Sequence, residues 1–159
     1  MSSSVTAGNL IRSPWIGDVE IDPECQLVFP SGLPGFEDHH QFLAVEIPAH
    51  RPVIYLQSTG DPPVCFVALP VHIIHPGFRI CLSEEERIVL DMDPAFEPVT
   101  GLDIICLALL MPSDETVEAS PDSVIVINLH NRCGVQCMPS SHNPATFRLS
   151  AGRGWVRIC

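Results

Sequence analysis

The chain contains no lysine, and its eight basic residues are all arginines. Nineteen acidic residues bring the formal net charge to -11 at pH 7. Direct binding of DNA or RNA needs clustered cations that neutralise phosphates, so this charge balance argues against nucleic acid as a direct ligand. It favours a basic protein partner instead, which an acidic surface attracts over roughly 8 Å at physiological salt.

Long apolar runs are also missing from the sequence. No run reaches the length of a membrane span, and the N-terminus, MSSSVTAGNLIRSP, has no apolar segment behind a basic start. We therefore expect a cytoplasmic protein that has no membrane partner. The seven cysteines are an odd number and several lie within apolar runs, which is typical of reduced, buried thiols rather than of a disulfide framework.

Signatures of catalysis and of cofactor binding are absent too. The chain has no GxSxG elbow, no glycine-rich phosphate loop and no HExxH pair, so we expect no enzyme activity and no cofactor. A zinc site needs four converging ligands, and the spacing of Cys133 and Cys137 has no second pair to complete it. The alternative hypothesis is a small β-domain with a Cys/His metal site at these cysteines, or a generic protein-interaction module.

What the sequence does contain is a regular β pattern. Turn residues recur about every eight to twelve residues, and most of the sixteen prolines fall between apolar runs rather than inside them. A chain of 159 residues is long enough to bury one core. The predicted strands are residues 17–21, 26–29, 42–47, 53–57, 64–69, 78–82, 102–111, 124–128, 135–138 and 146–149.

Two segments need separate arguments. Ser83 followed by Glu84, Glu85 and Glu86 fits a capping box with acids in the first turn, which predicts one short helix. Residues 102–111 are almost wholly apolar and are long enough for a buried helix, but β-branched residues and Pro112 favour a long central strand.

These elements predict an all-β fold, a small antiparallel β-barrel-like single domain with one short helix. Barrel closure removes the unpaired edges that an open sheet exposes. We expect the domain to span residues 15–150, after a flexible leader at residues 1–14 and before a C-terminal tail at residues 151–159.

Two phrases stand out at predicted turns. In residues 29–37, FPSGLPGFE, Pro34 and Gly35 fit a tight turn that needs a positive φ at the glycine, and Phe36 fits a plug at one barrel end. In residues 56–70, LQSTGDPPVCFVALP, Asp61 and the two prolines after it predict a turn, which places Gln57 at a strand exit.

These phrases carry a resemblance to a known family. With Phe42, with residues 125–129 (IVINL) and with residues 131–136 (NRCGVQ), they occur in an order and at a spacing similar to those of the flagellar assembly factor FliW family. The resemblance implies a non-enzymatic regulator that binds flagellin and also binds CsrA, a small RNA-binding dimer that represses flagellin translation. In that picture, flagellin export frees the factor to capture CsrA.

The resemblance and the exposed acids together suggest a set of partner-contact residues. Glu37 is the best candidate for outward contact, because an acid at an exposed bend has no obvious core role. Gln57 and Gln136 are candidates for which hydrogen bonds to local backbone are the competing interpretation. The full set is Phe36, Glu37, Gln57, Glu84, Glu85, Glu86, Asn128 and Gln136.

The chain departs from the family pattern at two places. Family members usually carry an aromatic residue followed by acids on the middle strand, where this chain has Phe78, Arg79, Ile80 and Cys81. Residues 120–124, SPDSV, replace the usual NLxAP sequence. An arginine facing a basic partner is unfavourable, so the neighbouring acids, with Asp91 and Asp93 among them, would shift the contact surface along the chain.

Overall fold

The computed structural model describes residues 10–20, 23–60, 62–112, 116–137 and 147–150. In these residues the fold is mostly antiparallel β-sheet with a few short helices, as the sequence predicts. The helical elements are η1 (Pro23–Cys25), η2 (Pro48–His50), α1 (Val71–Ile74) and α2 (Glu84–Val89). The strands are β1 (Leu10–Ser13), β2 (Gly17–Glu20), β3 (Gln26–Val28), β4 (Gln41–Glu46), β5 (Ile54–Ser58), β6 (Cys65–Pro70), β7 (Ile104–Pro112), β8 (Thr116–Asn128), β9 (Gly134–Cys137) and β10 (Phe147–Ser150).

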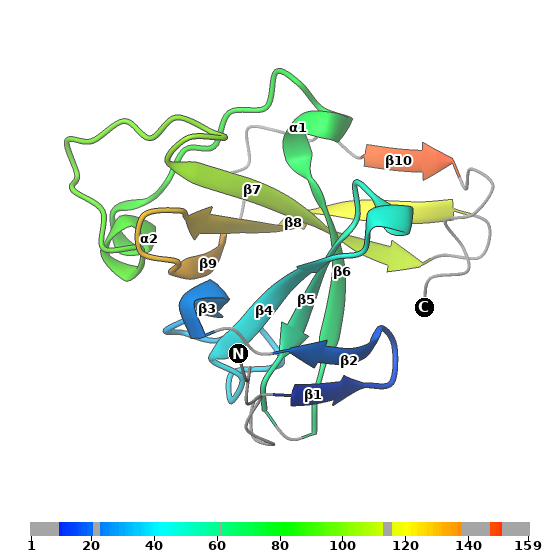
Figure 1. The fold of residues 1–159 in the computed structure, drawn as a ribbon. Helices are drawn as coiled ribbons and strands as arrows, with labels where there is room; N and C mark the ends of the chain where they lie inside the picture. Colours follow the sequence, from blue (N-terminus) through cyan, green and yellow to red (C-terminus); the bar gives the residue numbers. More distant parts are fainter. Residues whose placement is uncertain (1–9, 21–22, 61, 113–115, 138–146, 151–159) are drawn as a thin grey trace, which may run out of the picture.

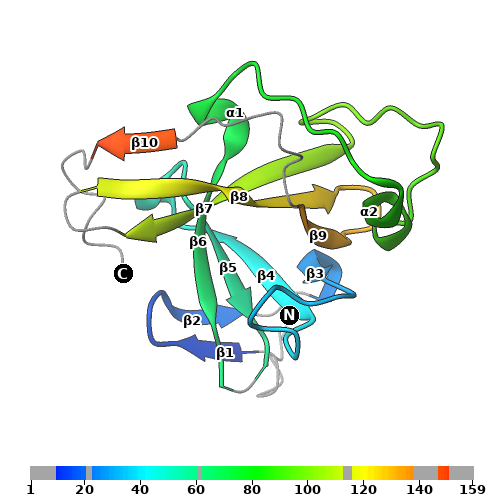
Figure 2. The same cartoon turned by 180° about the vertical axis from the view of Figure 1, so that it is seen from behind.

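The main sheet curls into a nearly closed barrel (Figures 1 and 2). Strands β3 to β8 pair with their neighbours in sequence order, while β9 and β10 pair with different parts of the long β8. The two ends of the sheet meet at a parallel bridge between Val28 and Cys133, where the Val28 N–H donates to the Arg132 carbonyl at 3.0 Å. The β1–β2 hairpin forms a separate small sheet.

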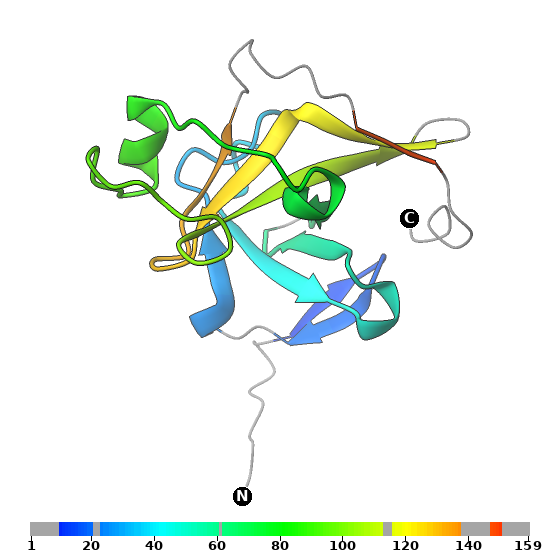
Figure 3. The ribbon, with the colours of Figure 1, turned by 90° about the horizontal axis from the view of Figure 1, so that it is seen from above.

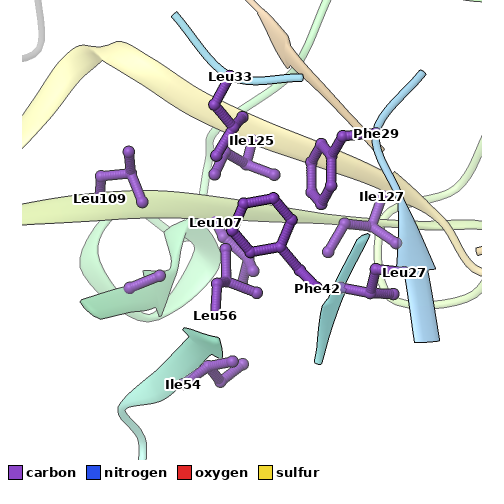
Figure 4. Close-up of a cluster of buried hydrophobic side chains, with 11 residues drawn as sticks. Leu27, Phe29, Leu33, Phe42, Ile54, Leu56, Leu107, Leu109, Ile125 and Ile127 are labelled. Carbon is purple, nitrogen blue, oxygen red and sulfur yellow. The ribbon is translucent and has the colours of Figure 1, made fainter. Parts of the chain in front are cut away.

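Both faces of β7 are buried, which explains its unbroken apolar sequence. Leu107 and Leu109 point into the barrel, whereas Ile104, Cys106 and Ala108 point to the outer face. The central-strand interpretation of this run is therefore confirmed. Figure 4 shows the interior cluster, whose members are Leu27, Phe29, Leu33, Phe42, Ile54, Leu56, Ala68, Leu107, Leu109, Ile125 and Ile127.

A second apolar cluster covers the outer face of β7, β8 and β9. Leu82, Leu90 and Met92, which flank α2, pack there with Val126 and Cys137 of the sheet. The capping box at the start of α2 is present as predicted: the Ser83 Oγ accepts from the Glu86 N–H at 3.1 Å, and Glu86 Oε1 accepts from the Ser83 N–H at 3.2 Å. This packing fixes α2 beside the β8–β9 turn (Figure 1).

The strand prediction for residues 78–82 is wrong, because this segment pairs with no strand in the described structure. The alternation of side chains along the segment does correspond to alternating burial. Phe78, Ile80 and Leu82 pack on the outer cluster, while Arg79 and Cys81 are exposed. Alternating burial was therefore produced by a loop lying across a sheet. Residues 10–13, expected in the leader, form β1, and the short α1 helix was not predicted.

Candidate functional site

The loop of residues 29–37 closes one end of the barrel. The Phe36 N–H donates to the Leu33 carbonyl at 2.7 Å, with Pro34 and Gly35 between them and a φ of 84° at Gly35. This is the predicted turn with proline at its second position and glycine at its third. Leu33 is buried beneath the turn, while Phe36 keeps 37% of its surface exposed. Phe36 is therefore a partial plug that also faces outward.

At this end of the molecule, aromatic rings from residues 29–37 contact aromatic rings on β4 and β6. Phe29 meets Phe42 edge to face with ring centroids 5.2 Å apart, and Phe36 meets Phe66 in the same way at 5.2 Å. A Cβ added to Gly134 would lie 2.4 Å from the Phe29 ring, so glycine is required for this close approach. The segments that carry the resemblance therefore pack against one another at this end of the barrel.

Glu37 has a local role that the sequence did not reveal. Its Oε1 accepts from the Gly35 N–H at 3.0 Å, and this bond, together with the residue's own N–H, lowers the pKa of the Glu37 carboxyl. The side chain is exposed. Glu37 therefore stabilises the turn and still presents a negative charge outward.

Gln57 and Asn128 are buried and serve the fold. The Gln57 Nε2 donates to the Ser58 and Val64 carbonyls at 3.1 and 3.3 Å, while its Oε1 has no hydrogen-bond partner. The Ser58 Oγ accepts from the Val64 N–H at 2.9 Å. These bonds fasten the β5–β6 hairpin, whose predicted turn residue Asp61 lies outside the described residues. Both side chains are buried rather than displayed at the surface.

The β8–β9 turn holds the C-terminal end of α2. Asn128 and Asn131 each donate a side-chain N–H to the Leu90 carbonyl at 2.9 Å. The Asn131 Oδ1 in turn accepts from the Cys133 N–H at 2.9 Å. The asparagines of this family phrase therefore dock the helix onto the barrel. Gln136 lies on β9, half-buried and paired in register with Ile125.

The acids of α2 divide into two kinds. Glu84 and Glu85 are exposed, whereas Glu86 is half-buried and forms the capping box.

Two buried cysteines lie on the sheet beneath this helix. Burial and the neighbouring Glu86 carboxylate raise the pKa of the Cys137 thiol, and burial raises the pKa of the Cys106 thiol to about 11. Both thiols stay protonated at neutral pH. No group of three possible metal ligands forms among the described side chains.

Sequence reasoning missed Arg87, Asp103 and His130. The Arg87 Nη1 donates to the Phe96 carbonyl at 2.6 Å and to the Asp93 carbonyl at 3.2 Å, which fixes the loop after α2. The His130 Nε2 lies 2.8 Å from Asp103 Oδ1, and the Val99 N–H donates to the other carboxylate oxygen at 2.8 Å. No local pattern marks these residues, because their partners belong to loops whose course only the fold determines.

The Asp103 pair predicts a dependence of stability on pH. The hydrogen bond from His130, and then that from the Val99 N–H, lower the pKa of the Asp103 carboxyl below its usual value. Because the pKa of Asp103 is lower in the folded protein than in the unfolded chain, the ionised carboxylate stabilises the fold. This contribution is complete above about pH 3.9, the pKa in the unfolded chain, and is lost as the pH falls through the pKa of the folded protein. In urea unfolding at several pH values between 6 and 2.5, the free energy of unfolding of Asp103→Asn should be lower than that of wild type at pH 6. The difference between the two proteins should become smaller as the pH falls. A constant difference would contradict this assignment.

Among the described residues, α1 with four residues and α2 with six are both too short to span a membrane.

Comparisons with known proteins agree with this scaffold. The family model described as FliW protein matches residues 10–148. The chain is 30% identical over 121 residues to the flagellar assembly factor FliW of Caldanaerobacter subterraneus subsp. tengcongensis, covering 76% of this chain and 78% of the relative. It is also 30% identical over 140 residues to the FliW of Geobacillus thermodenitrificans, covering 86% and 91%.

The fold agrees with an experimental structure as well. A crystal structure of the flagellar assembly factor FliW superposes with a TM-score of 0.71 at 26% identity, and the match covers 89% of this chain and 93% of that chain. The matched family residues include both the barrel-closing loop and the β8–β9 turn. The chain belongs to the FliW family of flagellar assembly factors, which is not an enzyme family.

Proposed function

We propose that this flagellar assembly factor acts in the cytoplasm by binding a CsrA-type translational regulator and flagellin. The observation that carries the proposal is the match to the FliW family over residues 10–148. The resemblance implies both partners. Binding of CsrA would oppose its action on flagellin mRNA, and binding of flagellin would compete with it, so flagellin export would control flagellin synthesis.

The charge of the chain supports a basic partner. Its net charge of -11 complements the cationic surface that an RNA-binding protein presents, and opposite charges speed association and favour the correct pairing. Such a contact weakens as salt rises, because salt screens exposed charges. A direct contact with RNA is disfavoured by the same charge.

The exposure of the side chains reduces the set of proposed contact residues. Phe36, Glu37, Glu84 and Glu85 are exposed at the surface, and Glu86 and Gln136 are half-buried. We place partner contacts at the four exposed side chains. Phe36 offers an apolar anchor at the barrel end, suited to the amphipathic helices of flagellin.

The deciding experiment is titration calorimetry of the purified protein with CsrA and with flagellin from the same genome, separately and together. We expect micromolar or tighter binding of each partner, and we expect saturation with flagellin to weaken the binding of CsrA. Absence of binding to both partners would overturn the proposed function.

A further inference from the structure

Large apolar side chains are exposed together on one side of the molecule. Ile88 of α2 is 70% exposed, and in the loop that follows, Leu102 is 69% and Val99 55% exposed. Phe96 in the same loop and Leu129 on the β8–β9 turn are exposed as well. We call the surface formed by α2, residues 91–103 and the β8–β9 turn the α2 face. Figures 1 and 3 show these segments lying on the same side of the barrel.

Hydrogen bonds hold the segments of the α2 face in fixed positions. The Arg87 side chain ties α2 to the loop at the Phe96 carbonyl, at 2.6 Å. The Leu129 N–H donates to the Asp103 carbonyl at 2.9 Å, and Asn131 joins the same turn to the end of α2 at the Leu90 carbonyl. The apolar side chains are therefore displayed on an ordered surface, which lowers the entropy cost of binding.

The same face carries a concentrated negative charge. Residues 83–103 contain seven acids and a single basic residue, Arg87, whose side chain donates to backbone carbonyls. None of the exposed acids within residues 83–103 takes part in a salt bridge to arginine among the described residues. These exposed acids are Glu84, Glu85, Asp91, Asp93 and Glu97.

We propose that the α2 face binds a cationic, amphipathic segment of the translational regulator, an inference that rests on the proposed function. Exposed apolar side chains and exposed acids in the same segments fit the usual anatomy of an interface, in which apolar anchors bind and charged residues select the partner. A second copy of this acidic chain would be repelled. The regulator is favoured over flagellin because an RNA-binding protein must present cations.

The position of Arg79 agrees with this assignment. Its side chain is exposed in the segment of residues 78–82, before α2, and this segment contains no acid. A cationic partner is therefore disfavoured at that segment and favoured at the acids that follow it. The α2 face gives this chain a contact surface a few residues further along.

Two variants test the apolar and the charged parts of the surface. Ile88→Ser with Leu102→Ser removes the most exposed apolar groups, and Glu84→Gln with Glu85→Gln removes two charges. The matched controls are Leu10→Ser with Ile73→Ser, and Asp18→Asn with Glu20→Gln, which make equivalent changes at exposed positions on β1, α1 and β2. In urea unfolding, all variants should have free energies of unfolding close to that of wild type, because substitutions of exposed residues cost little stability.

Calorimetric titration with purified CsrA, at low and at high salt, gives the result. We expect the apolar variant to raise Kd about tenfold or more, and the charge variant to raise Kd at low salt and to flatten its salt dependence. Both controls should bind like wild type. If the α2-face variants bind CsrA like their controls, or lose only flagellin, the inference is overturned while the proposed function stands. If wild type binds neither partner, both fall.

Discussion

Replacing Phe29 with alanine is expected to lower the free energy of unfolding by about 3–5 kcal/mol. Phe29 is fully buried in the barrel interior, packs edge to face on Phe42 at 5.2 Å, and fills the space that the missing Cβ of Gly134 leaves open. The smaller side chain would leave a cavity where the sheet closes, at a point that neighbouring backbone cannot easily fill. A loss of this size is a large share of the stability of an ordinary domain.

Urea unfolding of Phe29→Ala should be compared with that of Phe36→Ala. Both rings meet another phenylalanine edge to face at 5.2 Å, but Phe36 is 37% exposed and so leaves a smaller buried cavity. We expect Phe36→Ala to cost about 1–2 kcal/mol, since only part of its surface leaves water on folding. A loss for Phe29→Ala no larger than that for Phe36→Ala would contradict the cavity expected where the sheet closes.

Most of the β-structure could be predicted because local patterns and tertiary packing agree. The apolar run of β7 is read correctly as a strand since both of its faces are covered, and the capping box of α2 is determined by neighbouring residues. The turn at Pro34 and Gly35 is likewise local. In each case the residues that decide the structure lie within a few positions of one another.

Residues 78–82 show where that reasoning fails. Alternating apolar residues predict that one face of the segment is buried, and Phe78, Ile80 and Leu82 do pack on the outer cluster. The alternation does not say whether neighbouring backbone will pair, and here the segment crosses the sheet as a loop. Similarly, nothing local shows that Asp103 meets His130, because the pairing of β7 with the long β8, which sets Ile104 opposite Asn128, is what brings these two residues together.

The predicted contact residues illustrate a related difficulty. Gln57 and Asn128 belong to the phrases that identify the family, yet both are buried and bond to backbone carbonyls. A polar residue in a characteristic phrase can serve the fold as readily as a partner. The exposed apolar residues Ile88 and Leu102 were missed for the opposite reason, since apolar side chains in sequence suggest a core.

Gly32→Ala is expected to lower the free energy of unfolding by about 2–5 kcal/mol, because two costs combine at this position. Gly32 has a φ of 64°, a conformation that disfavours any side chain. In addition, a Cβ there would lie 2.7 Å from both the Cα and the carbonyl oxygen of Glu37. These are backbone atoms inside a closed turn, so the loop itself must shift to make room.

Gly35→Ala separates the two costs. Gly35 also has a positive φ, 84°, but a Cβ added to it would have no atom within 4 Å. The free energy of unfolding of Gly35→Ala should therefore fall only by the conformational cost of a positive φ, about 1–2 kcal/mol. Urea unfolding of both variants gives the comparison, and a Gly32→Ala loss no larger than that of Gly35→Ala would mean that the loop relaxes freely. The expected excess would instead show that residues 29–37 form a rigid cap, in which the Phe36 and Glu37 side chains are held in place.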